Sequence, residues 1–168
     1  MSGQGDKTCS ILVDLSRQVL TVQRQGQPDM SFPVSTASQG AGELADSFKT
    51  PRGSHYIRAC IGDGMPSGSV FVGRRPTGEI YSDALAAEHP DRDWILTRIL
   101  WLCGREPGRN RLGRVDSMGR YIYIHGTPDT EPMGVPASHG CIRMRNQDVI
   151  LLFSMVEPGT PVEISEDG

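Results

Sequence analysis

The sequence predicts a mainly β fold, a β-sandwich or barrel-like domain that also carries two or more short helices. Many short segments alternate apolar and polar residues and are separated by turn residues. Glycine (20 residues) and proline (12 residues) are frequent, as in chains with many turns. The 168 residues can bury one sizeable core but are too few for two ordinary domains. We therefore expect residues 1–168 to form a single domain.

Strands are expected to dominate the first half of the chain. Apolar residues alternate with polar ones on both sides of a polar turn at residues 16–18, which predicts a hairpin over residues 10–27. Further strands are expected at residues 31–38, 54–62 and 69–75. Between the first two of these, residues 38–53 are small and polar and end in a turn at Pro51 and Gly53, which is typical of a loop.

Residues 91–104 are predicted to be the first helix. Their large side chains recur at helical spacing, and Gly104 is a plausible end. The residues on this stripe are Trp94, Ile95, Arg98, Ile99 and Leu102.

The last part of the chain is predicted to be strand, helix and strand. In the strand at residues 120–126, Ile122 and Ile124 share one face, while the other face carries Tyr121, Tyr123 and His125. A helix follows at residues 146–156, with Asn146 as its cap and Asp148 near its positive end. Residues 159–165 are expected to form the final strand.

Composition and charge exclude some classes of partner. The net charge of −3 does not favour nucleic acid or an anionic membrane as a partner. No segment approaches the roughly 20 apolar residues of a membrane-spanning helix, and the start has no signal-peptide pattern. These features predict a cytoplasmic location. The four scattered cysteines fit a reducing compartment; they are Cys9, Cys60, Cys103 and Cys141.

Residues 120–146 hold the strongest candidates for chemistry, namely His125, His139 and Cys141. A thiol needs a nearby imidazole to become a nucleophilic thiolate. His125 ends the predicted strand, so its ring can project from the rim of the sheet. Gly140 allows a sharp turn that bares backbone N–H groups, which could bind an oxyanion. The loop between the two histidines could return Cys141 to the side of His125.

Two other interpretations compete with a cysteine nucleophile. A lone cysteine is most often a buried small hydrophobe. Alternatively His125, His139 and Cys141, with His55 as a further candidate, could bind zinc. Zinc sites usually show closer paired spacing, and no second pair exists here, so no metal and no other cofactor is predicted. His139 is expected to support the loop rather than to act in catalysis.

The segments "IHGTP", "ASHGCIRMRNQDVILLF" and "PGTPVEI" resemble the YkuD family, the L,D-transpeptidase catalytic domain of bacteria. The family motif is a histidine, a gap, and then Ser/Thr-x-Gly-Cys-hydrophobic-Arg. The matching residues are His125, Ser138, Gly140, Cys141, Ile142 and Arg143. The segments "VDLSRQVLTV", "PVSTA" and "KTPRG" resemble the family's opening strands and its Thr-Pro-x-Gly turn, so the likeness spans nearly the whole chain.

The resemblance implies an acyl-enzyme mechanism on peptidoglycan. Cys141 would attack the amide after the third residue of a stem tetrapeptide, with His125 as general base, and terminal D-Ala would leave. The carbonyl of Gly126 would orient the imidazole, and the N–H groups of Gly140 and Cys141 would form the oxyanion hole. Supporting or substrate-binding roles would fall to Tyr123, Ser138, His139 and Arg143.

The acceptor of the acyl group is the main open alternative. Because the chain shows no export signal, the resemblance implies an L,D-carboxypeptidase that uses water to recycle muropeptides. A transpeptidase that forms 3-3 crosslinks or exchanges D-amino acids remains possible, and so does a non-catalytic muropeptide-binding module, which should have lost the thiol. The sequence does not indicate the oligomeric state.

Arginine side chains could read the carboxylates of a stem peptide. One candidate is an arginine of the segment 105–120, and another is Arg143, which could equally lock a loop by a salt bridge. The arginines of the segment are Arg105, Arg109, Arg111, Arg114 and Arg120.

Overall fold

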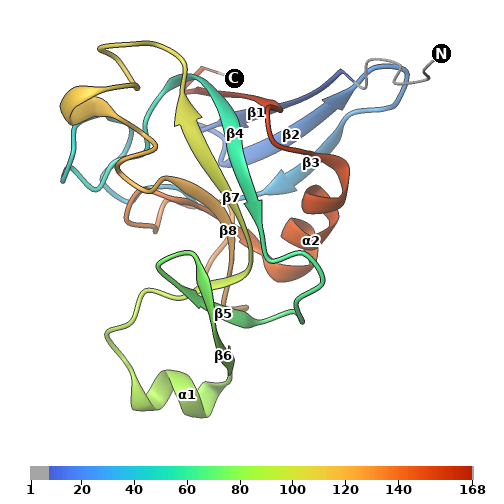
Figure 1. Cartoon of the computed structure of the whole chain (residues 1–168), viewed down its shortest axis with the longest axis vertical. Helices are drawn as coiled ribbons and strands as arrows, with labels where there is room; N and C mark the ends of the chain where they lie inside the picture. Colours follow the sequence, from blue (N-terminus) through green and yellow to red (C-terminus); the bar gives the residue numbers. More distant parts are fainter. Residues whose placement is uncertain (1–7, 168) are drawn as a thin grey trace.

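The computed structural model describes residues 8–167, which form one curled ten-stranded sheet and two α-helices (Figure 1). The prediction of a mainly β fold with short helices is confirmed. Residues 1–7 contribute to the prediction of location and lie outside the described residues. The elements are β1 (Cys9–Asp14), β2 (Val19–Arg24), β3 (Met30–Pro33), β4 (Gly53–Ile61), β5 (Ser69–Val72), β6 (Arg75–Ile80), α1 (Asp83–Glu88), β7 (Ile95–Gly104), a 3-10 turn (Gly113–Val115), β8 (Tyr123–Thr127), β9 (Ile142–Arg145), α2 (Asn146–Met155) and β10 (Pro161–Ser165).

The sheet runs in the order β3-β2-β1-β10-β4-β7-β5-β6, and β8 joins β7 to β9 off this path. The predicted first hairpin is confirmed, since β1 and β2 pair antiparallel with Ile11 opposite Val22. β10 lies parallel to β1 and antiparallel to β4, which places the end of the chain inside the sheet. The hairpin β5–β6 and the short helix α1 project from one end of the molecule (Figure 1).

The main core lies between the curled sheet and α2. The helix packs on β7, β8 and β9 and contributes Val149 and Leu152, both fully buried. Ile122 and Ile124 of the β8 region face this core, whereas Tyr123 belongs to a second, smaller apolar cluster. The opposite directions predicted for Ile122 and Tyr123 are therefore confirmed, but β8 begins at Tyr123 rather than at residue 120, and Tyr121 lies in the preceding turn with a φ of 58°.

The helix predicted at residues 91–104 is wrong, because this segment forms strand β7. β7 is a central strand, paired along one edge with β5 and then β4 and along the other edge with β8. Nearly all of its side chains are buried, on both faces of the sheet. A strand buried on both sides reads as a continuous apolar run, which spacing alone does not separate from a buried helix. Gly104 accordingly ends a strand, where it packs tightly against Asn110.

The predicted cap of α2 is also wrong. The N-cap position is Arg145, and its side chain makes no capping hydrogen bond. Asn146 instead turns its amide toward the sheet, where it accepts a hydrogen bond from Thr97 and donates one to the carbonyl of Thr127. Helix α1, which the sequence did not indicate, has the better cap, since Ser82 accepts from the N–H of Leu85.

Candidate active site

The parallel pair β8–β9 brings the predicted nucleophile and base into one region. Ile124 lies opposite Ile142, and His125 lies opposite Arg143. Cys141 immediately precedes β9, so it falls beside the start of β8, near Tyr123. The charges of Asp93 and Arg143 influence the pKa values of both His125 and Cys141, which also indicates that the two groups share one site.

Residues 35–38 hold the loop that precedes Cys141. Ser35 and Arg143 exchange backbone hydrogen bonds of 2.9 Å in both directions. Thr36 accepts from the N–H of Ser138, and Thr50 donates its hydroxyl to the carbonyl of Gly140 at 2.9 Å. The second half of the strand predicted at residues 31–38 therefore acts as a brace for the candidate site rather than as a continuation of β3. Thr50 belongs to the Thr-Pro-x-Gly turn, which was its only signal in the sequence.

His125 is held as a buried imidazole whose neutral form is favoured. The residue is 1% exposed, and burial lowers the pKa of its imidazole. Its Nδ1 lies 2.6 Å from the carbonyl oxygen of Gly126. A carbonyl can only accept, so we assign the ring proton to Nδ1. Nε2 then keeps its lone pair and is available to take a proton.

Gly126 is required by its surroundings. A Cβ at this position would lie 2.5 Å from Oδ1 of Asn146 and 2.6 Å from the backbone oxygen of Leu96. β7 reaches this close because its pairing with β8 is irregular between Leu96 and Ile99. Within this bulge, Thr97 has a φ of 76°, an uncommon value for a β-branched residue. The tight packing fixes the carbonyl that orients His125.

Cys141 is partly buried, and its Sγ is bound to backbone groups. The N–H of Tyr123 donates to Sγ at 3.3 Å, and the thiol donates to the carbonyl of Tyr121 at 3.4 Å. Among the described residues, no hydrogen bond joins Sγ to His125. Burial raises the pKa of the thiol to about 12. These shifts favour a neutral thiol and a neutral imidazole, and the thiol proton is directed at the Tyr121 carbonyl rather than at His125.

Ser138 and Gly140 shape the backbone around the thiol. The hydroxyl of Ser138 donates to the carbonyl of Cys141 at 2.6 Å and accepts from the N–H of Gly140 at 3.2 Å. Gly140 has a φ of 133°, which favours glycine. Because its N–H is already bonded to Ser138, the N–H of Cys141 is the better placed of the two predicted oxyanion donors.

Arg143 and His139 share a carboxylate that the sequence did not single out. Arg143 is almost buried and lies 3.4 Å from Asp93 and 3.5 Å from Glu131, and it also donates to the carbonyl of Ala137. These contacts match the loop-locking role of Arg143. His139 is exposed, with Nδ1 3.8 Å from Asp93. Asp93 lies in the segment that was mistaken for the start of a helix, which explains why it was missed.

Two hollows flank His139. One of about 290 Å³ is lined by Cys141, Arg120, Tyr121 and the loop around Phe48. The other, of about 190 Å³, is lined by Asp93 and Arg143. Of these two hollows, only the first is lined by Cys141.

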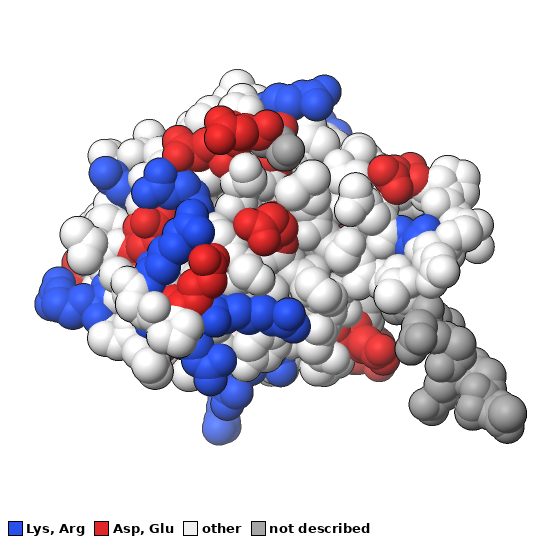
Figure 2. All heavy atoms as spheres, turned by 90° about the horizontal axis from the view of Figure 1, so that it is seen from above, with Lys and Arg blue, Asp and Glu red and all other residues white. Residues whose placement is uncertain are grey.

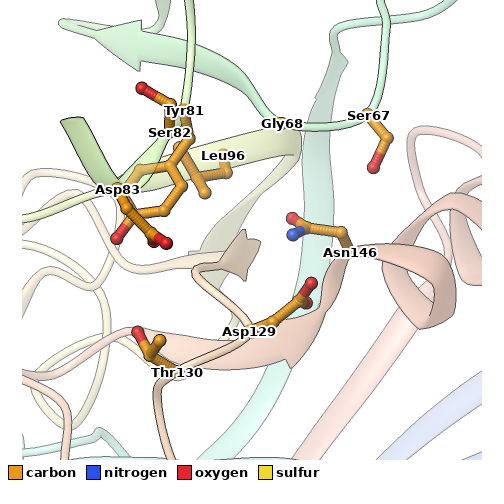
Figure 3. A pocket seen from close by; sticks show the side chains of 9 residues that line it. All are labelled: Ser67, Gly68, Tyr81, Ser82, Asp83, Leu96, Asp129, Thr130 and Asn146. Carbon is orange, nitrogen blue, oxygen red and sulfur yellow. The ribbon is translucent and has the colours of Figure 1, made fainter. Parts of the chain in front are cut away.

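Larger hollows lie elsewhere on the molecule. In Figure 3, a hollow of about 380 Å³ is bordered by Asp83 of α1, Asp129 and Asn146. Its lining contains neither a histidine nor a cysteine. The same holds for a hollow of about 390 Å³ bordered by Arg52 and Arg109. On chemical grounds the candidate site is the hollow of about 290 Å³ beside Cys141.

The arginines of residues 105–120 do not form a single positive patch. Figure 2, which views the end at the top of Figure 1, shows basic and acidic side chains interleaved. Arg109 pairs with Glu106 at 3.1 Å. Arg120 is the member of this set that lines the hollow beside Cys141, but it donates to the carbonyls of Gly42, Glu43 and Lys49. Its structural role is to fasten the loop over that hollow.

The histidines and cysteines do not gather into a metal site. No group of three or more potential ligands that could hold a metal ion occurs within residues 8–167. His55 is fully buried away from Cys141, where Nε2 contacts the hydroxyl of Ser117 at 2.8 Å. Within the same described range, neither helix is long and apolar enough to cross a membrane.

Comparison with known proteins supports the resemblance seen in the motifs. The family model of the YkuD L,D-transpeptidase catalytic domain matches residues 10–164. The YkuD protein of Bacillus subtilis (strain 168) is 52% identical over 50 residues, which are 29% of this chain and 30% of that protein. The "Probable L,D-transpeptidase YbiS" of Escherichia coli (strain K12) is 42% identical over 50 residues, which are 30% of this chain and 16% of that protein.

Solved structures show the same fold. L,D-transpeptidase 3 from Mycobacterium tuberculosis, in complex with a faropenem-derived adduct, aligns with a TM-score of 0.57 and 18% identity over 95% of this chain and 60% of that chain. The L,D-transpeptidase from Mycobacterium smegmatis aligns with a TM-score of 0.54 and 17% identity over 94% of this chain and 58% of that chain. This chain thus spans less than two thirds of each of these proteins. The match over residues 10–164 establishes that the chain belongs to the YkuD family of L,D-transpeptidase catalytic domains.

Proposed function

We propose that the protein is a cysteine L,D-carboxypeptidase that removes terminal D-Ala from peptidoglycan stem tetrapeptides. Cys141 is the nucleophile and His125 the general base. When substrate enters, the Sγ proton passes to Nε2 of His125 and Sγ attacks the carbonyl carbon after the third stem residue. The imidazolium then protonates the departing amine of D-Ala, and a thioester remains on Cys141.

Several features of the site support this mechanism. The Gly126 carbonyl fixes the Nδ1 tautomer of His125, so that Nε2 is the proton acceptor. The Cys141 N–H supplies an oxyanion donor next to the nucleophile. A long or absent Sγ–imidazole contact does not argue against the pair, because catalytic hydrogen bonds often tighten only when substrate binds.

The size of the two hollows favours water as the acceptor. The hollow on the Arg143 side of His139 has a volume of about 190 Å³, against about 290 Å³ for the hollow beside Cys141, so it offers less room for a second peptide. Water needs only a narrow path to the thioester. A second stem peptide must be bound with its amine oriented toward the thioester before it can react faster than water.

A second candidate function is transfer to an amine. The smaller hollow carries the carboxylates of Asp91, Asp93 and Glu131, which would attract a protonated amino group. This observation supports exchange of the terminal residue for a free D-amino acid, or formation of 3-3 crosslinks.

Mass analysis of the products separates these activities. The purified protein is incubated with a disaccharide-tetrapeptide, alone and with an excess of a free D-amino acid. We expect disaccharide-tripeptide and free D-Ala as the main products in both cases. Crosslinked dimers as the main product, or a tetrapeptide with a new terminal residue, would show that an amine is preferred over water. Unchanged tetrapeptide would refute the proposed function.

A further inference from the structure

We propose that Arg74, at the tip of the β5–β6 hairpin, binds a carboxylate in the part of the stem peptide that stays on Cys141. This inference rests on the proposed function and assigns a substrate-binding residue outside the family motif. Arg74 was not among the arginines that the sequence singled out. Its position depends on the folding of a distant hairpin onto β7 and β8.

Cys141, Tyr123 and Trp101 lie side by side across neighbouring strands, and this row of three residues leads from Cys141 to Arg74. Tyr123 of β8 donates its N–H to Sγ of Cys141, and Trp101 of β7 lies opposite Tyr123. Side chains of paired residues share a face of the sheet, and the two rings are in edge-to-face contact at 6.3 Å. Cys141, Tyr123 and Trp101 accordingly belong to one apolar cluster.

The guanidinium of Arg74 lies on this row. Its Cζ is 4.7 Å from the ring centre of Trp101 and 4.8 Å from that of Tyr121. Nη1 donates to the hydroxyl of Tyr123 at 3.0 Å. Tyr121 also provides the carbonyl that holds the thiol of Cys141. Aromatic contacts on this scale fix a cation without neutralising it.

No carboxylate of residues 8–167 forms an ion pair with Arg74. Several other arginines of the described chain do have such partners, for example Arg52 with Glu43 and Arg92 with Glu79. The polar partner of Arg74 is a neutral phenol, which leaves most of its donors available. Arginine presents these donors in a planar fork that matches a carboxylate.

The turn that carries Arg74 is an unfavourable place for arginine. Val72 pairs with Arg75, so Gly73 and Arg74 form a two-residue turn, with φ values of 56° and 65°. Turns of this type favour glycine, asparagine or aspartate, because other residues adopt positive φ reluctantly. An arginine at the second position therefore suggests that its side chain is needed there.

The distance from Cys141 to the Trp101 position indicates which part of the substrate Arg74 can reach. Two strand spacings of about 4.8 Å separate Cys141 from the Trp101 position, hence about 10 Å. An extended peptide covers about 3.3–3.6 Å per residue, so this span corresponds to two or three residues. The carboxylate of the single departing D-Ala would lie closer to Sγ than that. A carboxylate on the second stem residue, the one before the residue whose carbonyl Cys141 attacks, lies at a suitable distance.

The test compares Arg74→Gln, Arg74→Lys and wild type on three peptides. One is the stem tetrapeptide, one has an amide in place of the carboxylate on its second residue, and one has a C-terminal amide. We expect Arg74→Gln to lower kcat/KM about 10- to 100-fold on the first and third peptides. On the second peptide it should change kcat/KM less than about threefold, and Arg74→Lys should be intermediate. Arg75→Gln, at the exposed neighbouring position, is the matched control and should behave like wild type.

Each alternative gives a different pattern. A purely structural clasp would lower kcat/KM equally on all three peptides and would overturn the proposal, as would no change on any of them. Arg74→Gln could instead lower kcat/KM on the first two peptides and leave it unchanged on the peptide with a C-terminal amide. That result would assign Arg74 to the departing residue and overturn its assignment to the retained part.

Binding of the same peptides to Cys141→Ala protein, measured by calorimetry with and without Arg74→Gln, gives a readout independent of turnover. If wild type cleaves no peptide, the proposed function fails, and the binding ratios still decide the role of Arg74. A thermal melt of each variant verifies that it is folded.

Discussion

Replacing Gly126 with alanine tests whether the close packing of β7 on β8 sets the position of the base. The added Cβ would lie 2.6 Å from the backbone oxygen of Leu96, where ordinary contacts begin at 3.4 Å. The two strands must therefore separate by about 0.8 Å, and a backbone atom cannot rotate away as a side chain can. Overpacking of this kind typically costs 1–3 kcal/mol, and we expect about 3 kcal/mol here. For a chain of this size, that loss lowers the Tm by about 6–12 °C.

The same substitution should impair catalysis beyond its effect on stability. The Gly126 carbonyl holds Nδ1 of His125 at 2.6 Å, so a shift of nearly 1 Å moves the base. Displacements of that size can reduce rates about 100-fold. D-Ala release should be measured well below the Tm of the variant. Gly119→Ala is the stability control, because its Cβ would meet only the movable side chain of Asp116. A Gly126→Ala protein with the Tm and kcat/KM of wild type would refute this account of the site.

Three further outcomes are expected. Cys141→Ser should abolish D-Ala release while its far-UV circular dichroism stays unchanged, because a hydroxyl beside one imidazole is a far weaker nucleophile than a thiolate; residual activity near wild type would exclude a cysteine mechanism. Burial lowers the pKa values of His55 and His125, so the unfolded chain binds more protons below its own histidine pKa of about 6.5. The free energy of unfolding should therefore fall as pH drops below 6.5. The acid limb of the pH profile of kcat/KM should likewise have its midpoint below 6.5. A midpoint above 6.5 would contradict a buried neutral base. Arg143→Ala should lower stability by about 1–2 kcal/mol and speed proteolysis within residues 128–140, because the partners of Arg143 are half-exposed and its contacts are long; unchanged cleavage would exclude its role as a lock on the loop.

The predictable part of the fold was the part with local signals. Alternation with a polar turn identified the β1–β2 hairpin, and the opposite faces of Ile124 and Tyr123 were assigned as the structure has them, although β8 begins at Tyr123 and not at residue 120. Strand β7 was missed because a centrally buried strand has no polar face. The helical spacing of Trp94, Arg98 and Leu102 was a coincidence of an almost continuous apolar run.

The residues singled out for chemistry were recognisable because they follow one another in a motif, and their roles in catalysis remain predictions. Their supports were not recognisable. Asp93, Thr97 and Arg74 reach the site from β5, β7 and the turns beside them, segments that approach it only after folding. Asn146 carried a misleading local signal, since a polar residue before an apolar helix usually caps it. The sheet instead uses its amide to bridge β7 and β8.

The resting site stores its nucleophile in an unreactive form, and the fold explains how. The Tyr121 carbonyl and the Tyr123 N–H lie where β8 begins, and a longer β9 would offer them a backbone partner. β9 begins one residue too late to supply that partner, and Sγ of Cys141 takes its place. Burial raises the pKa of this thiol, and its S–H is directed at the Tyr121 carbonyl rather than at Nε2 of His125. We infer that a substrate whose own backbone bonds to the Tyr121 carbonyl and the Tyr123 N–H would release Sγ for reaction. A peptide can do this by strand addition, which couples recognition of an extended peptide to release of the nucleophile.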